Sequence, residues 1–163
     1  MTNEIDQAQF TQTYRELLPA ISRYLSRRVP EREVEDLAAQ TFEIAWRKRH
    51  EVTAGEELPW LYKIASFQVA NYRRKHQSAV RYLVLSLVPE SAPSAESLAI
   101  FDLDLAAAWR TLSSAEQALL ALVVFEGLSV QEAATASEIS ANAASIRLHR
   151  ARKKLADQLA TKD

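Results

Sequence analysis

The residues whose types and spacing best suit a chemical task lie near the C-terminus, where cations follow a group of short polar side chains. The polar residues are Ser140, Asn142 and Ser145, and the cations that follow are Arg147, Arg150, Arg152, Lys153 and Lys154. Hydroxyl and amide groups can hydrogen-bond the edges of bases, and guanidinium and ammonium groups bind phosphates. The segment is therefore predicted to bind nucleic acid, although an amphipathic terminal helix with a solvated basic face would show a similar pattern.

A helix-turn-helix is the element that would position these side chains. Ser129 and Ser140 are predicted to cap two helices, with residues 137–139 as the turn between them. Ser114 is predicted to cap the helix that precedes them. On the second helix, three- and four-residue steps predict one buried stripe formed by Ala144, Leu148, Ala151 and Leu155. A helix that buries one face in this way and presents polar groups near its N-terminus suits the major groove of DNA.

The charges along the chain are segregated, although the whole chain of 163 residues has a net charge of only −1. Residues 82–138 contain one cation and eight acids, whereas residues 139–163 contain six cations and two acids. A second basic island, residues 61–81, has five cations and no acid. Two separate cationic surfaces predict two contacts with one polyanion.

Composition and motifs exclude several classes of protein. The chain has no cysteine, so it cannot form disulfides or Cys-ligated zinc sites, which agrees with a reducing cytoplasm. Its longest wholly apolar run, residues 118–125, is far shorter than the ~20 residues of a membrane span. The three histidines lie far apart in the sequence, and the two glycines form no phosphate-binding loop. No catalytic residue, metal site or cofactor is therefore predicted, and the protein is not expected to be an enzyme.

The sequence predicts an all-α fold of two small helical domains joined by a flexible linker. Glycine is scarce and helix-forming residues are abundant, which argues against the tight turns of a β-fold. Prolines and serines interrupt the helical periodicity at residues 89–97, and the next helix is expected at residues 98–111. We therefore expect an N-terminal domain in residues 1–77, a linker in residues 78–97, and a C-terminal domain containing the helix-turn-helix in residues 98–163.

A polar stripe is predicted on a helix spanning residues 33–49. Its members, which recur at three- and four-residue steps, are Asp36, Gln40, Glu43 and Arg47. Such a stripe is either a docking surface or simply a solvated face. Trp46 and Trp60 are expected in the core.

Three ordered blocks of the sequence resemble the extracytoplasmic-function, or group IV, sigma factors of bacterial RNA polymerase. The first is residues 35–47, the second is residues 59–65 followed by residues 71–74, and the third runs from residue 112 through the helix-turn-helix to residue 152. The resemblance covers most of the chain and implies a region 2-like N-terminal domain and a region 4-like C-terminal domain. The chain departs from the family pattern at Ala39, Gln40 and Asn71, and at Glu138, where a turn glycine is frequent.

The resemblance implies an alternative sigma factor that binds core RNA polymerase and directs promoter recognition and transcription initiation. Its implied partners are the β′ and β subunits of the polymerase, promoter DNA and an anti-sigma factor, in the cytoplasm and without membrane insertion. The polar stripe becomes the implied polymerase-binding surface, and residues 50–57 become a loop that receives an unstacked base. The residues implied to bind the −10 promoter element are Lys63, Asn71, Arg73, Arg74 and Lys75. Those implied to bind the −35 element are Ser140, Asn142, Ser145, Arg147, Arg150 and Arg152.

Two other classes of protein remain open from the sequence. A sigma-factor mimic could bind an anti-sigma factor without touching DNA, but it would have no use for two basic islands. A conventional helix-turn-helix regulator would need only residues 112–158, and it would leave the block around Asp36 unexplained.

Overall fold

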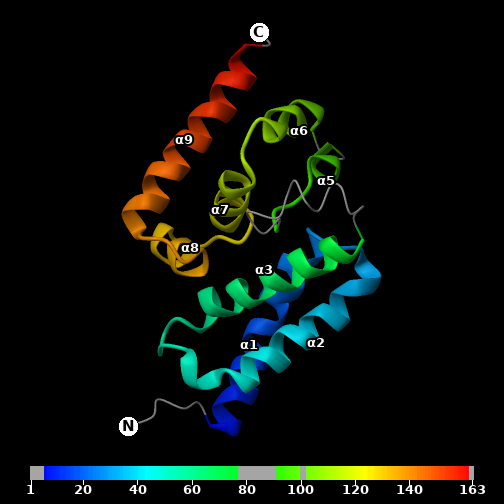
Figure 1. Ribbon diagram of the computed structural model, residues 1–163, viewed down its shortest axis with the longest axis vertical. Coiled ribbons are helices and arrows are strands. Elements are labelled where there is room, and N and C mark those ends of the chain that lie inside the picture. Colours follow the sequence, from blue (N-terminus) through cyan, green and yellow to red (C-terminus); the bar gives the residue numbers. More distant parts are fainter. Residues whose placement is uncertain (1–5, 77–90, 100–101, 162–163) are drawn as a thin grey trace. The chain divides into compact units, whose positions relative to one another are not determined.

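The structure is a computed structural model that describes residues 6–76, 91–99 and 102–161, and all regular structure in these residues is helical (Figure 1). The chain divides into two compact units, residues 1–77 and 78–163. The all-α prediction is therefore confirmed. Most of the expected linker, residues 78–90, lies outside the described residues.

The N-terminal unit is a bundle of three helices that pack pairwise against one another: α1 (Gln7–Ser26), α2 (Glu31–Arg47) and α3 (Glu57–Lys75). A short 3-10 helix, η1 (Arg49–Glu51), begins the connection from α2 to α3. Asp6 caps α1 in a reciprocal arrangement with Gln9, which satisfies two backbone N–H groups that the helix cannot pair by itself.

Aliphatic and aromatic side chains fill the core of this unit. Ile21 and Leu25 of α1 and Val69 of α3 are fully buried. Trp46 of α2 packs edge-to-face on Phe10 with ring centroids 5.0 Å apart, and because both side chains are half-buried this pair lies at the edge of the core in which Trp46 was expected. These contacts fix the angular position of α2 and α3, because each helix has one apolar face to bury.

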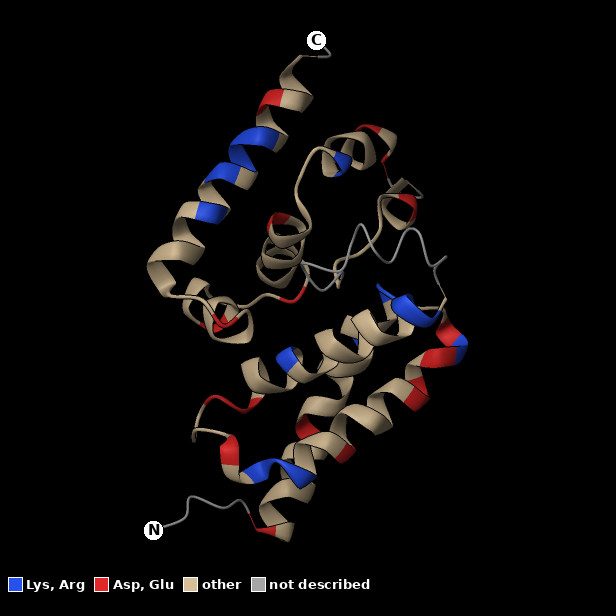
Figure 2. Ribbon diagram, in the orientation of Figure 1, with Lys and Arg blue, Asp and Glu red and all other residues tan. Residues whose placement is uncertain are grey.

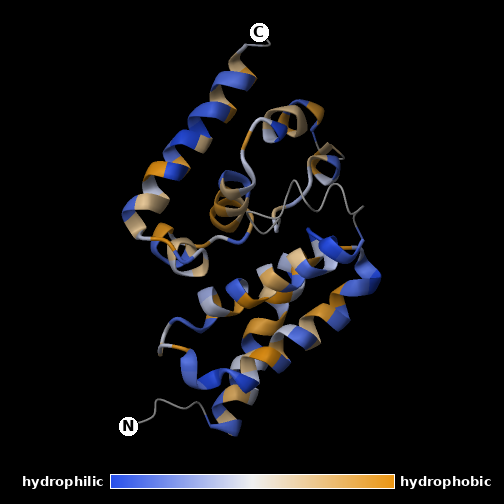
Figure 3. Ribbon diagram, viewed as in Figure 1, coloured by the Kyte–Doolittle hydropathy of each residue, from blue (hydrophilic) through white to orange (hydrophobic). Residues whose placement is uncertain are grey.

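The C-terminal unit contains five short helices in its described residues: α5 (Ala95–Ala99), α6 (Leu103–Arg110), α7 (Ser114–Val124), α8 (Val130–Ala136) and α9 (Ala141–Ala160). The strongly hydrophobic α7 lies inside the unit (Figure 3). α9, the longest helix of the unit, packs against α6, α7 and α8.

The start of the C-terminal unit differs from the helix pattern expected there. The single helix predicted at residues 98–111 is two helices, because the Asp102 carboxylate accepts hydrogen bonds from the Asp104 and Leu105 N–H groups and starts α6 anew. The residues expected to end the linker are ordered against α6. The buried Trp109 indole N–H donates to the Pro93 carbonyl at 2.8 Å, and Leu98 of α5 is buried. A buried indole requires a hydrogen-bond acceptor, and this requirement ties residues before 98 to the C-terminal unit.

Candidate nucleic-acid interface

The predicted helix-turn-helix is present, formed by α8, a turn and α9. The Ser129 hydroxyl accepts a hydrogen bond from the Glu132 N–H at 3.1 Å, and the Glu132 carboxylate accepts one from the Ser129 N–H. The Ser140 hydroxyl accepts from the Ala143 N–H at 3.1 Å and starts α9. Both predicted caps are confirmed. Glu138 has φ of 56°, the left-handed conformation that favours glycine, and this explains why the position often holds glycine in the family the sequence resembles.

One face of α9 is buried and the opposite face is exposed. Ala144, Leu148 and Ala151 are buried, as predicted, while Leu155 is only half-buried. The predicted base-contacting residues Ser140, Asn142 and Ser145 are all exposed near the N-terminal end of the helix. The cations follow as bands along the middle of α9 (Figure 2).

Two of the predicted phosphate-binding arginines lie together in an open groove of about 520 Å³ between α9 and the first turn of α7. Its lining includes Arg147 and Arg150 of α9 together with Ser113 and Ala115. Within the part of the chain that the structure describes, neither arginine forms a salt bridge. The N-terminal turn of α7 adds the positive end of a helix dipole to the same groove.

The third predicted arginine is not part of this group. Arg152 follows Arg150 by two residues, which places it about 200° further around the helix, and it does not line the groove. Lys154 lines the groove but is already paired: its Nζ lies 2.8 Å from Oε1 of Glu116. The structure therefore brings Arg147 and Arg150 together and leaves Arg152 on another face.

The acid in this pair, Glu116, is a structural residue that the sequence analysis missed. It also accepts a hydrogen bond from the Ser113 N–H at 3.1 Å, so one buried carboxylate both caps α7 and holds α9. The expected cap of α7 was Ser114, but the cap is Ser113, which stands three residues before Glu116. The Ser-x-x-Glu spacing was the available signal.

Opposing effects set the pKa of Glu116. Burial alone raises the pKa of this carboxyl, but hydrogen bonds from Lys154 and from Ser113, with the positive charge of Lys154, outweigh burial. The net result is a pKa below the ordinary value of 4.5. The ionised form of Glu116 is therefore part of the native packing between α7 and α9.

In the N-terminal unit, the predicted polar stripe of α2 is exposed along its length. Asp36, Gln40, Glu43 and Arg47 all face solvent. Arg47 and Glu43 are 3.8 Å apart across one turn, and with both side chains about two-thirds exposed this ion pair adds little stability. The stripe is thus available to a partner and is not required by the fold.

An exposed aromatic residue lies among the predicted −10 residues of α3. Phe67 is 45% exposed, and it stands four residues after Lys63 and four before Asn71, with Arg74 one further turn along. These spacings place all four on one side of the helix. Phe67 was not predicted as a site residue, although its four-residue spacing from Lys63 and Asn71 was visible.

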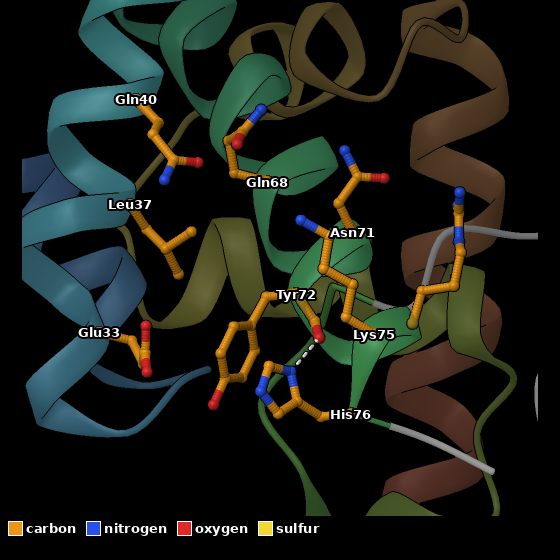
Figure 4. A pocket seen from close by; sticks show the side chains of 9 residues that line it. Glu33, Leu37, Gln40, Gln68, Asn71, Tyr72, Lys75 and His76 are labelled. Atoms are coloured by element: carbon orange, nitrogen blue, oxygen red, sulfur yellow. Dashed lines mark hydrogen bonds between the residues drawn. The ribbon is translucent and has the colours of Figure 1, made fainter.

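A groove of about 410 Å³ between α2 and the C-terminal half of α3 joins two of the predicted sets (Figure 4). Gln40 from the α2 stripe lines it together with Asn71, Arg74 and Lys75 of α3. Arg73 points elsewhere: its Nη2 donates to the Arg28 carbonyl at 3.1 Å, where it ties α3 to the end of α1. Arg73 therefore has a packing role, and its neighbour Arg74 faces the groove.

Two further findings concern only residues 6–76, 91–99 and 102–161. No group of three or more histidines or acids there could hold a metal ion. No helix there is long and apolar enough to cross a membrane.

A helical protein with an exposed recognition helix and a second basic face belongs, by its architecture, to the DNA-binding class. Family models are more specific: the model described as "Sigma-70 region 2" matches residues 13–79, and the model described as "Sigma-70, region 4" matches residues 102–155. Over 138 residues the chain is 30% identical to RNA polymerase sigma factor NccH of Alcaligenes xylosoxydans xylosoxydans, covering 78% of this chain and 73% of that protein. The chain therefore belongs to the sigma-70 family, in its extracytoplasmic-function group, and is an alternative sigma factor.

Solved structures share the fold. CnrH, solved in complex with the cytosolic domain of CnrY, matches with a TM-score of 0.66 and 24% identity, covering 97% of this chain and 92% of that chain. The sigma factor RpoE, solved in complex with the anti-sigma factor NepR from Bartonella quintana, matches with a TM-score of 0.62 and 22% identity, covering 94% and 98%. At these identities the likeness is one of fold.

The depressed pKa of Glu116 predicts a pH-dependent stability difference. A carboxyl whose pKa is lower in the folded than in the unfolded protein stabilises the fold above its unfolded pKa, and this contribution is lost as the pH falls through the folded value. Glu116→Gln should therefore be less stable than wild type at pH 7, with a difference that shrinks below about pH 4.5. Urea unfolding followed by circular dichroism across this range measures it.

The matched control is Glu132→Gln, which changes the equivalent capping residue of α8; among the described residues no lysine forms a salt bridge with Glu132. Its stability loss should be smaller at pH 7. A Glu116→Gln difference that stays constant from pH 7 to pH 3 would show that the ionised carboxylate is not what holds α7 and α9 together.

Proposed function

We propose that this sigma factor divides promoter recognition between its two units, with α9 reading the −35 element and the exposed side of α3 binding the −10 element. The observation that carries the proposal is the outward face of α9, where exposed Ser140, Asn142 and Ser145 precede the groove arginines Arg147 and Arg150. Polar side chains at the start of a recognition helix reach base edges, and cations beside it contact phosphates.

The −10 element would be bound as a partly unpaired strand. Phe67 offers a ring on which an unstacked base can stack, while Lys63 and Arg74 on the same side of α3 attract the backbone. The connection between α2 and α3, which includes η1 and a turn at Gly55 with φ of 87°, supports the role proposed for residues 50–57 as the loop that receives a flipped base.

The α2 stripe would dock on the coiled coil of the polymerase β′ subunit. Its exposure and its mixture of acid, amide and base fit a polar interface better than a packed one. Gln40 belongs both to the stripe and to the groove shared with Asn71 and Arg74. Polymerase bound at α2 would therefore lie directly beside the bound −10 strand.

An anti-sigma factor is proposed as a third partner. CnrH and RpoE, which share this fold, were each solved with a bound protein, the cytosolic domain of CnrY and the anti-sigma factor NepR. We place the activity in the cytoplasm, where core polymerase and promoter DNA are found, and assign the protein no catalytic step of its own.

Run-off transcription with purified core polymerase tests the whole proposal. A sigma factor gives a transcript from its promoter, whereas a mimic or a conventional helix-turn-helix regulator gives none in the absence of another sigma factor. The three variants below separate the polymerase contact, the −35 contact and the −10 contact.

Asp36→Arg should weaken binding to core polymerase about a hundredfold, because a like-charge contact at an interface costs several kcal/mol. The substitution is on an exposed side chain, so the thermal unfolding temperature should change little. Glu35→Arg makes the same charge change one residue earlier on an exposed position outside the stripe, and it should keep near-normal affinity in a fluorescence binding assay. Equal affinities of the two variants for core polymerase would show that the stripe is an ordinary solvated face.

Arg150→Ala should flatten the dependence of promoter affinity on salt, since each phosphate contact contributes about 0.9 to the slope of log affinity against log salt. Arg147→Ala should flatten this slope by a similar amount. Arg152→Ala is the comparison variant, because it removes an equal charge outside the groove and should leave the slope unaltered. A slope unchanged by all three would remove the α7–α9 groove from the DNA interface.

Phe67→Ala should weaken holoenzyme binding to a forked template with a single-stranded −10 element by about tenfold, within the range for loss of one base-stacking contact. Phe67→Tyr keeps the ring and should bind nearly as wild type. Binding to a −35 duplex alone should not respond to either change. Wild-type affinity of Phe67→Ala for the fork would show that no base stacks there.

A further inference from the structure

The outward face of α9 includes one large apolar side chain that the fold does not use. Ile146 is 46% exposed, and helical periodicity places it almost opposite the buried stripe of Ala144, Leu148 and Ala151. It stands four residues after Asn142 and four before Arg150, so the three side chains share one side of the helix. Ile146 also lines the rim of the α7–α9 groove, beside Arg147 and Arg150.

The surroundings of Ile146 identify what it would touch. It lies in the second turn of the recognition helix, between an amide and a guanidinium, and not among other exposed apolar side chains of α9 that could form a protein-docking patch. In the major groove the C5 methyl of thymine is an apolar feature that the other bases lack, and aliphatic or methyl side chains contact it. The charge of the neighbouring arginines favours a nucleic acid over an apolar protein partner.

Asn142 is the second side chain of α9 that we expect to contact a base. An asparagine side chain can donate a hydrogen bond from its amide N–H to N7 of adenine and accept one at its amide oxygen from the N6 amino group, and this pair of hydrogen bonds selects adenine. Four residues along a helix rise about 6 Å, and stacked base pairs are about 3.4 Å apart. Asn142 and Ile146 therefore reach base pairs about one or two steps from each other.

We propose that Asn142 and Ile146 form a base-reading pair, with Asn142 selecting an adenine and Ile146 a thymine methyl one or two base pairs away in the −35 element. This inference rests on the proposed role of α9 and adds the sequence that α9 prefers. Ser140 and Ser145 contribute hydrogen bonds with little discrimination, because a hydroxyl can pair with several base edges.

Selection of randomised −35 sequences by the reconstituted holoenzyme would first identify the preferred element. Each thymine is then replaced singly by deoxyuridine, which removes the methyl group and keeps the base pair. With wild-type protein, one replacement should lower affinity about fourfold, the value of one buried methyl group. With Ile146→Ala, the same replacement should have no effect, while overall affinity for the thymine-containing element is reduced by a similar factor.

Two further variants sharpen the test. Leu159→Ala removes another exposed apolar side chain from the far end of α9 and should leave the deoxyuridine effect unchanged. Asn142→Ala should abolish the penalty for replacing the selected adenine with purine, which lacks the amino group. Circular dichroism of each variant should match the wild type, because the substituted side chains are exposed.

The outcomes distinguish this inference from the proposed function on which it rests. If Arg150→Ala flattens the salt slope while Ile146→Ala and wild type respond equally to deoxyuridine, α9 binds DNA but Ile146 reads no methyl group. If selection yields no adenine and thymine within two base pairs, the reading pair is overturned. If none of these variants alters promoter binding, the role of α9 itself fails. Loss of anti-sigma binding by Ile146→Ala, with unchanged base preference, would assign Ile146 to a protein interface and overturn the inference.

Discussion

Burial of Ala144, Leu148 and Ala151 is the constraint on which the C-terminal unit depends. Because α9 packs against α6, α7 and α8 through this stripe, its rotation about its own axis is fixed. A shift of one residue in the stripe would turn every other side chain by about 100°. The two alanines in the stripe also let the neighbouring helices approach closely. Asn142, Ile146 and Arg150 therefore point outward because the buried stripe occupies the inward face of the helix.

In the N-terminal unit, two adjacent arginines of α3 differ in the same way: one packs against another part of the fold and the other is exposed. Arg73 donates to the Arg28 carbonyl and ties α3 to the end of α1, while Arg74 faces the groove beside Gln40. About 100° of helix rotation separates an arginine that ties two helices together from one that lines the groove. The two arginines carry the same charge, and their roles differ because their side chains point in different directions.

Local sequence signals predicted the local features of this protein well. The serine caps, the helix-turn-helix and the buried face of α9 depend on residues three or four positions apart, and each was visible in the sequence. Two errors were local, the cap of α7 and the break before α6 at Asp102. The other features that were not predicted are contacts between distant residues. Pro93 meets Trp109, Glu116 meets Lys154, and Arg28 meets Arg73, and no periodicity encodes such partners. For this reason the hydrogen bond that holds Pro93 to the C-terminal unit and the pairing of Lys154 were not predicted. The family assignment succeeded because it used ordered blocks and not single residues.

The pairing of Lys154 with Glu116 bears on how strongly the protein would bind the non-specific DNA of a genome. With that lysine neutralised, the groove offers two arginines to the phosphate backbone. If α9 binds DNA as proposed, a contact through two arginines releases few counterions and adds little affinity for arbitrary sequence. A genome presents millions of competing sites, and a factor with a strongly basic surface would be sequestered on them. On the proposed role of α9, the internal pairing of Lys154 would limit this sequestration and leave discrimination between promoters to the side chains that meet the bases.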